Sequence, residues 1–179
     1  MNEIERKLRR SSVLVICLWV GSAAIFLPLV IPNGISESIA HNHGGHFILT
    51  EMLLCLAICA YGIKANGGDG RIPKRLTRSI PRWIKAATVI VAAGAAVINV
   101  SFWVSGAGGI SHELEDGRHA TMVHGEVISY ITEQQYLRRN LLCVLAFMSF
   151  PFAFGTASVA LLLGQVKLAA SEKNDRSNG

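Results

Sequence analysis

Long uncharged apolar runs alternate with shorter polar segments along this chain. Residues 13–31, 86–104 and 141–163 contain no charged side chain, and each is close to the roughly 20 residues that a helix needs to cross the hydrocarbon core of a bilayer. Residues 47–63 form a shorter fourth run that contains Glu51. Because a bilayer can thin around a short helix, the pattern predicts an all-α membrane protein, a bundle of four transmembrane helices.

The polar segments between these runs give the expected organisation. We expect a cytoplasmic tail (1–12), a first span (13–31), a short outer loop (32–46), a second span (47–63), a basic cytoplasmic loop (64–85), a third span (86–104), a larger second outer loop (105–140), a fourth span (141–163) and a second cytoplasmic tail (164–179).

Composition supports a membrane protein rather than a soluble enzyme. The 179 residues are 51% hydrophobic and 16% charged, whereas soluble domains carry about 25% charged residues. The net charge of +5 is concentrated, because 14 of the 17 Lys and Arg residues lie in 1–12, 64–85 and 164–179. Short basic loops stay in the cytoplasm, so we expect both termini inside, in a cell inner membrane. The basic surplus is then an orientation signal, and no nucleic-acid partner is expected.

The first apolar run follows a basic start, as in a secretory signal peptide. It is longer than the 7–15 residues of a typical signal core. We therefore expect an uncleaved membrane anchor.

The second outer loop carries signals for regular structure. Residues 118–123 and 126–131 alternate loosely around His124-Gly125, which predicts a short β-hairpin with a two-residue turn. Thr132 and Gln135 fit a capping box, so the fourth helix is expected to begin outside the membrane.

Side chains at the ends of the spans are candidates for anchoring in the headgroup region. Aromatic and basic residues gather at membrane interfaces. The expected anchors are Trp83, Lys85, Tyr136 and Arg138.

The third span is rich in small residues. Ala92 and Ala96 have a spacing that permits close helix packing, which we expect to serve contacts within the bundle. Asn99 and Ser101 are expected to donate hydrogen bonds across the bundle.

All six histidines fall in the predicted outer segments, and His41, His43 and His46 are the densest group. Imidazole binds zinc, copper and iron, so these three are the candidate ligands of a divalent transition metal. Their spacing is not that of a strong motif, and solvated loop histidines are the alternative interpretation.

Glu51 is the most informative single residue. A carboxylate within a spanning segment is costly and is a functional candidate. Proton or ion handling requires it to face the bundle and meet a partner, for which Asn99 is a candidate. The alternative is that the second span begins deeper and leaves Glu51 at the interface.

The sequence contains no nucleophile elbow, phosphate-binding loop or dinucleotide fingerprint. The four cysteines lie in apolar runs and are interpreted as small apolar filler. No enzymatic activity and no required cofactor are therefore expected.

Three functions stay open. The first is a small non-enzymatic membrane protein that acts through contacts with a membrane-protein partner, of the immunity, exclusion or accessory type. The second is an extracytoplasmic metal-binding or transport-accessory protein that uses the outer histidines. The third is a small proton- or ion-coupled transporter that uses Glu51.

Overall fold

The computed structural model describes residues 3–31, 34–65, 74–105 and 110–177. Five helices and three strands follow one another along these residues. They are α1 (Glu3–Val30), α2 (Gly34–Ala65), α3 (Lys74–Ser79), α4 (Arg82–Ser105), β1 (Ile110–Glu113), β2 (His119–Val123), β3 (Glu126–Ile131) and α5 (Glu133–Ser177).

Four of the helices are long and apolar enough to cross a membrane: α1, α2, α4 and α5. Each of the four apolar runs in the sequence falls in a different one of them. The expectation of a mostly helical chain with four potential spans is therefore confirmed.

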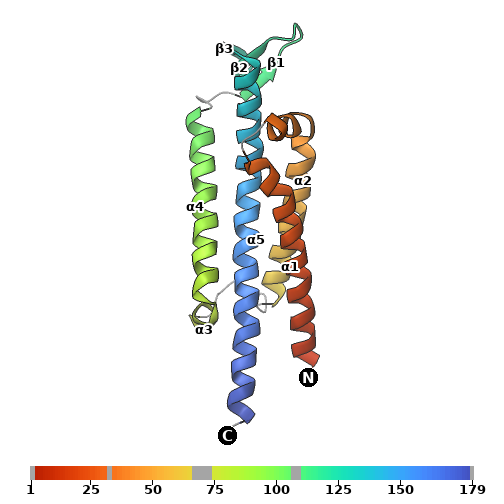
Figure 1. Cartoon of the computed structure of the whole chain (residues 1–179), viewed down its shortest axis with the longest axis vertical. Helices are drawn as coiled ribbons and strands as arrows, with labels where there is room; N and C mark the ends of the chain where they lie inside the picture. Colours follow the sequence, from red (N-terminus) through yellow and green to blue (C-terminus); the bar gives the residue numbers. More distant parts are fainter. Residues whose placement is uncertain (1–2, 32–33, 66–73, 106–109, 178–179) are drawn as a thin grey trace.

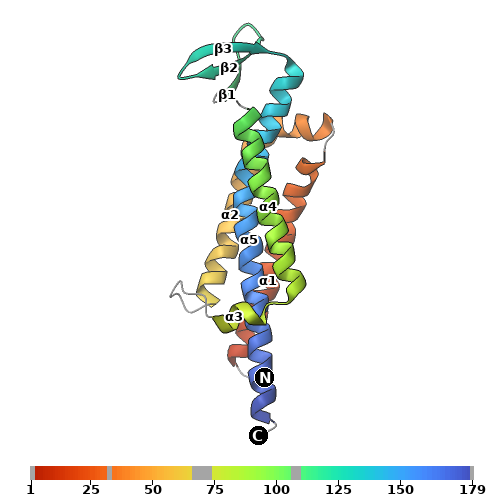
Figure 2. The same ribbon diagram turned by 90° about the vertical axis from the view of Figure 1, so that its left-hand side faces the viewer.

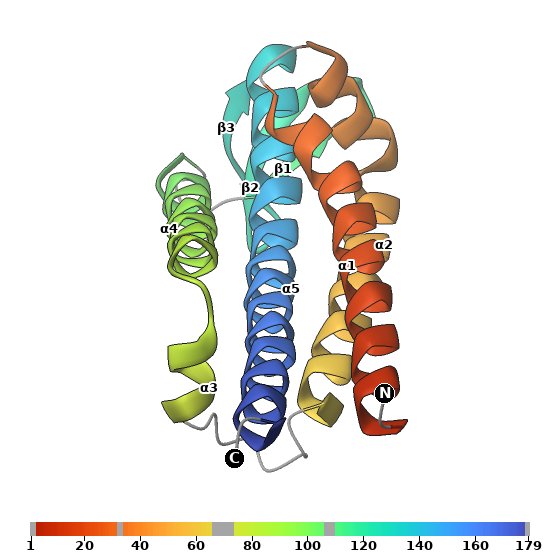
Figure 3. The same ribbon diagram turned by 60° about the horizontal axis from the view of Figure 1, so that its bottom comes forward.

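Helix α5 is the central element of the bundle. It packs against α1, α2, α3 and α4, and Figure 3 shows α4 on the opposite side of α5 from α1 and α2. Both chain ends lie at one end of the bundle and the strands lie at the other (Figure 1). We call these the terminal end and the sheet end.

Helix α2 begins earlier than expected. Residues 34–46, which the sequence suggested as a loop, are helical, and Figure 2 shows this first part lying across the sheet end before α2 descends along the bundle. Its inward face is made of small side chains spaced four residues apart, Ser36, Ala40 and Gly44, and all three are buried. These residues lack the bulk by which an amphipathic helix is recognised in a sequence.

The predicted hairpin is confirmed. Strands β2 and β3 pair antiparallel around a turn at His124 and Gly125, whose φ angles are 52° and 88°. Positive φ at both central residues is characteristic of the type I′ turn that suits a two-residue hairpin. Strand β1 was not expected; it pairs antiparallel with β2 and completes a sheet in the order β1-β2-β3.

The capping box at the start of α5 is also confirmed. The backbone N–H of Thr132 donates to Gln135 Oε1 at 3.0 Å, and the backbone N–H of Gln135 donates to Thr132 Oγ1 at 3.3 Å. These two bonds satisfy N–H groups that the first turn of a helix otherwise leaves unpaired.

Aromatic rings form the core between α1 and α5. The ring centroid of Phe152 lies 4.8 Å from that of Phe26 and 5.9 Å from that of Trp19, with both pairs stacked. Leu29 and Met148 are buried around them. This cluster holds α1 against α5.

Candidate functional site

Glu51 lies in the interior of the bundle. The residue is 0% exposed, so its side chain faces the neighbouring helices. Ser22 Oγ of α1 donates a hydrogen bond to Glu51 Oε1, and the thiol of Cys55, one turn further along α2, donates to the same oxygen at 3.4 Å. The other oxygen, Oε2, is buried and has no hydrogen-bond partner among the described residues.

The continuous buried face of α2 places Glu51 there. The face that begins with small residues at the sheet end continues through Glu51, Cys55 and Ile58, all of which are at most 2% exposed. A spacing of three and four residues keeps side chains on one face of a helix. Glu51 therefore occupies a position where an apolar residue is expected.

Contacts between α2 and α5 keep a constant register. A Cβ on Gly44 would meet Val144, and a Cβ on Gly155 would lie 3.3 Å from Cys55 Sγ. Ser158 Oγ lies 3.5 Å from Cys59 Sγ and donates to it. The residue numbers rise together, so the two helices run in the same direction and Glu51 lies near the level of Pro151.

Polar and apolar contacts close the site toward the terminal end. Trp19 Nε1 donates to Thr156 Oγ1 at 3.0 Å, and beyond this bond Val15, Ile58 and Leu162 form a buried apolar cluster. Together with the aromatic core, these contacts surround the Glu51 carboxyl with mainly apolar side chains.

Asn99 is not the partner of Glu51. Its side-chain N–H₂ donates to Ser149 Oγ and to the carbonyl of Ala95, both at 2.8 Å. The expected hydrogen bond across the bundle is thus confirmed, but it joins α4 to α5. The hydroxyl of Ser22 and the thiol of Cys55 supply the contacts that the sequence suggested Asn99 would make. Ser101 is exposed, so a bond from it across the bundle is not observed.

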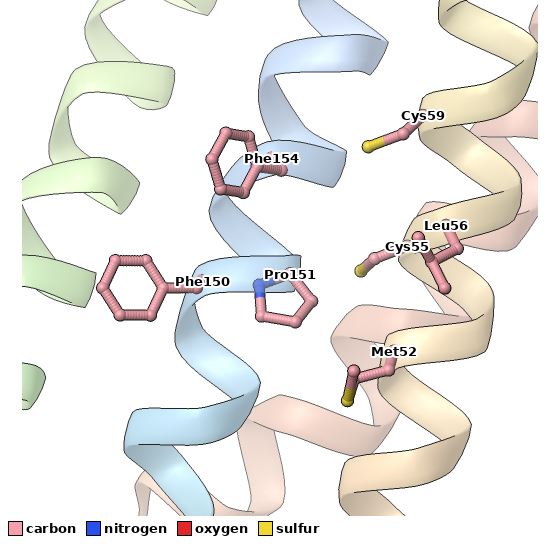
Figure 4. Close-up of a pocket in the computed structure, with 7 residues that line it drawn as sticks. All are labelled: Met52, Cys55, Leu56, Cys59, Phe150, Pro151 and Phe154. Carbon is pink, nitrogen blue, oxygen red and sulfur yellow. The ribbon is translucent and has the colours of Figure 1, made fainter.

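A pocket of about 350 Å³ lies between α2 and α5, and Cys55, which donates to Glu51, is part of its lining. Figure 4 shows the sulfur atoms of Met52, Cys55 and Cys59 on the side of α2 that faces α5. The remaining lining is apolar: Leu56, Phe150, Pro151 and Phe154. Sequence reasoning treated the cysteines as filler and missed this pocket; the spacing of Met52, Cys55 and Cys59 at three and four residues was the available signal.

The candidate metal ligands His41, His43 and His46 lie on the first part of α2 and are exposed. A helix turns about 100° per residue, so positions 41 and 43 point to nearly opposite sides. In the described parts of the chain, no three His, Cys, Asp or Glu side chains gather in a way that could hold a metal ion. The metal site at these histidines stays a prediction.

Two histidines instead contact Tyr136 at the start of α5. The ring of His119, from β2, stacks on Tyr136 with centroids 4.4 Å apart, and the ring of His41 meets Tyr136 edge-on at 5.5 Å. Tyr136 is 8% exposed, so its ring contacts protein and is not free to anchor in headgroups as expected. These ring contacts hold the sheet and α2 on α5.

The other expected anchors are exposed. Trp83 is 72% exposed at the beginning of α4, and Lys85 and Arg138 are also exposed. Trp103, which the sequence analysis did not single out, is 71% exposed near the other end of α4.

Ala92 and Ala96 are exposed on α4, not packed within the bundle. The expectation that their spacing serves contacts inside the chain is wrong, because α4 packs against α5 through a different face that contains the buried Ile84 and Ala95.

Among the features described above, the enclosed Glu51 carboxyl is therefore the best candidate for binding a ligand. Carboxylate and hydroxyl oxygens bind hard cations, and thiol and thioether sulfurs bind soft ones; the Glu51 neighbourhood holds both kinds. No protein-family model, curated protein or solved structure matches this chain.

Proposed function

We propose that this protein is a small multi-pass transporter of the cell inner membrane that binds a cation at Glu51. The observation that carries the proposal is the complete burial of Glu51 in the bundle, with Oε2 unpaired among the described residues. A buried polar atom without a partner costs free energy. A bound cation supplies the partner that Oε2 lacks.

The depth of Glu51 supports the proposal. Trp83 and Trp103 are exposed and 20 residues apart, about 30 Å along a helix, which is the thickness of the hydrocarbon core. Trp103 lies one turn beyond Asn99, and Asn99 contacts Ser149. Pro151, which lies near the level of Glu51, is two residues further along α5 than Ser149. The carboxyl therefore lies about 9 Å deeper in the bilayer than Trp103.

Energetics supports a functional role at that depth. A charged residue costs about 2.5–3.5 kcal/mol on the insertion scale at the centre of a membrane helix, which is an upper bound for the cost at the depth of Glu51. The hydrogen bonds from Ser22 and Cys55 offset part of this cost. A leucine at the same position would carry no such cost, so the presence of a carboxyl favours a role in binding.

The orientation of the protein follows from its charges. Both termini lie at one end of the bundle (Figure 2), and the segments that contain most Lys and Arg residues join the helices at that end. The positive-inside rule assigns this end to the cytoplasm. The sheet end, with all six histidines, then faces outward.

The test is cation-driven current in proteoliposomes. Jumps of H⁺, Na⁺, K⁺ and Ag⁺ are applied to the wild type, to Glu51→Gln and to Glu115→Gln, whose carboxyl is exposed near the sheet. We expect at least one cation to evoke a current that Glu51→Gln abolishes and Glu115→Gln retains. Currents that are absent, or equal in wild type and Glu51→Gln, would remove the proposal.

Contact with a membrane-protein partner is the second candidate function. It is favoured by α4, which packs extensively against α5 alone among the described elements and exposes Ala92 and Ala96. Small residues permit close approach of a second helix in a bilayer. A photo-crosslinker at position 96 is expected to capture another protein, whereas one at the exposed Val20 of α1 is not; equal labelling at both positions would argue against a specific partner.

A further inference from the structure

Three sulfur atoms line one wall of the pocket beside Glu51. They come from Met52, Cys55 and Cys59 on a single face of α2 (Figure 4). We infer that this pocket binds a soft monovalent metal cation, Cu(I) in the cell, through these sulfurs. The inference rests on the proposed cation site at Glu51 and names the class of cation that it takes.

The ligand set selects a soft metal. Thiolate and thioether sulfurs favour Cu(I), whereas oxygen ligands favour magnesium, calcium and manganese. Met52 is 42% exposed, and its flexible side chain allows its sulfur to move toward the two thiols. The other lining side chains are apolar, which excludes competing oxygen ligands from the wall opposite the sulfurs.

The two thiols already have polar partners suited to a metal-bound state. Cys55 donates to Glu51 Oε1 at 3.4 Å, and Cys59 accepts a hydrogen bond from Ser158 at 3.5 Å. Gly155 lets α5 approach Cys55 closely, because a Cβ there would lie 3.3 Å from its sulfur. Partners of this kind orient metal ligands and adjust their basicity.

Charge balance favours a monovalent cation. When Cys55 coordinates Cu(I), its S–H bond breaks, a Cu–S bond forms, and the proton passes to the neighbouring carboxylate oxygen of Glu51. Cys59 keeps its proton and, like Met52, binds through a neutral sulfur. No electron is transferred, and the net charge of the cation, Cys55, Cys59 and the carboxyl is zero before and after the step. A divalent cation on the same groups would leave one uncompensated charge in an apolar site, which is strongly unfavourable.

The inference is tested by competitive Cu(I) titration of the full chain in lipid nanodiscs, without oxygen, against a chromophoric Cu(I) chelator. We expect one Cu(I) per chain, displaced by Ag(I). Cys55→Ser with Cys59→Ser should weaken binding by more than about 100-fold, and Met52→Leu by at least about 10-fold. Cys17→Ser with Cys143→Ser is the matched control, because these thiols lie outside the pocket; it should bind as the wild type does.

X-ray absorption of the Cu(I)-loaded wild type gives a readout independent of whether the variants fold. We expect scattering from sulfur neighbours; a shell of nitrogen or oxygen neighbours without sulfur would overturn the assignment. Absent binding, or equal losses in the pocket and control double variants, would also overturn it.

The two proposals fail separately. A current that depends on Glu51 for H⁺, Na⁺ or K⁺, together with no sulfur-dependent Cu(I) binding, refutes the soft-metal site and keeps the proposed function. Sulfur-dependent Cu(I) binding without any current that depends on Glu51 refutes the transport function and keeps the metal site.

Discussion

The thiol of Cys55 lies 3.4 Å from Glu51 Oε1, one turn away on the same face of α2. The same cysteine lines the pocket between α2 and α5. Cys55 therefore belongs both to the surroundings of the buried carboxyl and to the sulfur-lined pocket, and makes them one site.

Removing the hydroxyl that contacts Glu51 should destabilise the bundle. Ser22→Ala removes a hydrogen bond from a buried carboxyl. We expect the free energy of unfolding in mixed micelles to fall by about 1–3 kcal/mol. Ser101→Ala is the control, since Ser101 is exposed on α4. If the two variants unfold alike, Ser22 does not support Glu51.

Neighbouring glycines of α2 should respond in opposite ways to the same substitution. In Gly44→Ala the new Cβ would lie 2.7 Å from Val144 Cγ2, so the Val144 side chain or the two helices must shift. We expect the free energy of unfolding to fall by about 1–3 kcal/mol. A Cβ at position 45 would have nothing within 4 Å. Gly45→Ala should therefore raise the free energy of unfolding by up to about 1 kcal/mol, because alanine has the higher helix propensity.

Unfolding curves of the two variants provide the measurement, and Val144→Ala should rescue Gly44→Ala. An equal effect of the two glycine substitutions would contradict the close packing of α2 on α5.

The hydrogen bond between α4 and α5 should appear as a coupling energy. Asn99 donates to Ser149 at 2.8 Å, and such bonds between membrane helices average about 0.6 kcal/mol in double-mutant cycles. The cycle consists of Asn99→Ala, Ser149→Ala and the double variant. A coupling energy of zero would show that α4 is held by apolar contacts alone.

The turn before β2 should lose an ion pair in acid. The Arg118 guanidinium donates to Asp116 at 2.7 Å, and this hydrogen bond lowers the pKa of the Asp116 carboxyl. A lowered pKa means that the pair stabilises the turn above the ordinary aspartate pKa of about 3.9 and loses this effect as the pH falls through the lower folded value.

Carboxyl NMR titration should therefore find the pKa of Asp116 below its ordinary value in the wild type and closer to it in Arg118→Gln. An unchanged pKa in Arg118→Gln would contradict the pairing.

The sequence predicted the features that depend on local patterns. Four apolar runs, the turn at His124-Gly125 and the capping box of Thr132 and Gln135 each have a signature within a few residues, and the structure confirms the corresponding helices, hairpin and cap. Features that depend on tertiary packing could not be predicted from the sequence. The early start of α2 is stabilised by small side chains against α5, and such residues have no apolar signal of their own.

Only the part of the candidate site that depends on a local pattern was predicted. Glu51 was identified because a charge in an apolar run is visible in the sequence. Its partner Ser22 lies 29 positions away on another helix. The way in which α1 and α2 align cannot be predicted from the sequence of either helix alone. The sulfur pocket likewise needs Phe150 and Phe154 of α5 as its second wall.

An infrared difference spectrum of the protein in bilayers, recorded with and without the cation that evokes current, shows directly whether Glu51 binds that cation. We expect a carboxyl difference band that persists in Glu115→Gln and is absent from Glu51→Gln. Identical difference spectra for the wild type and Glu51→Gln would contradict a cation site at Glu51.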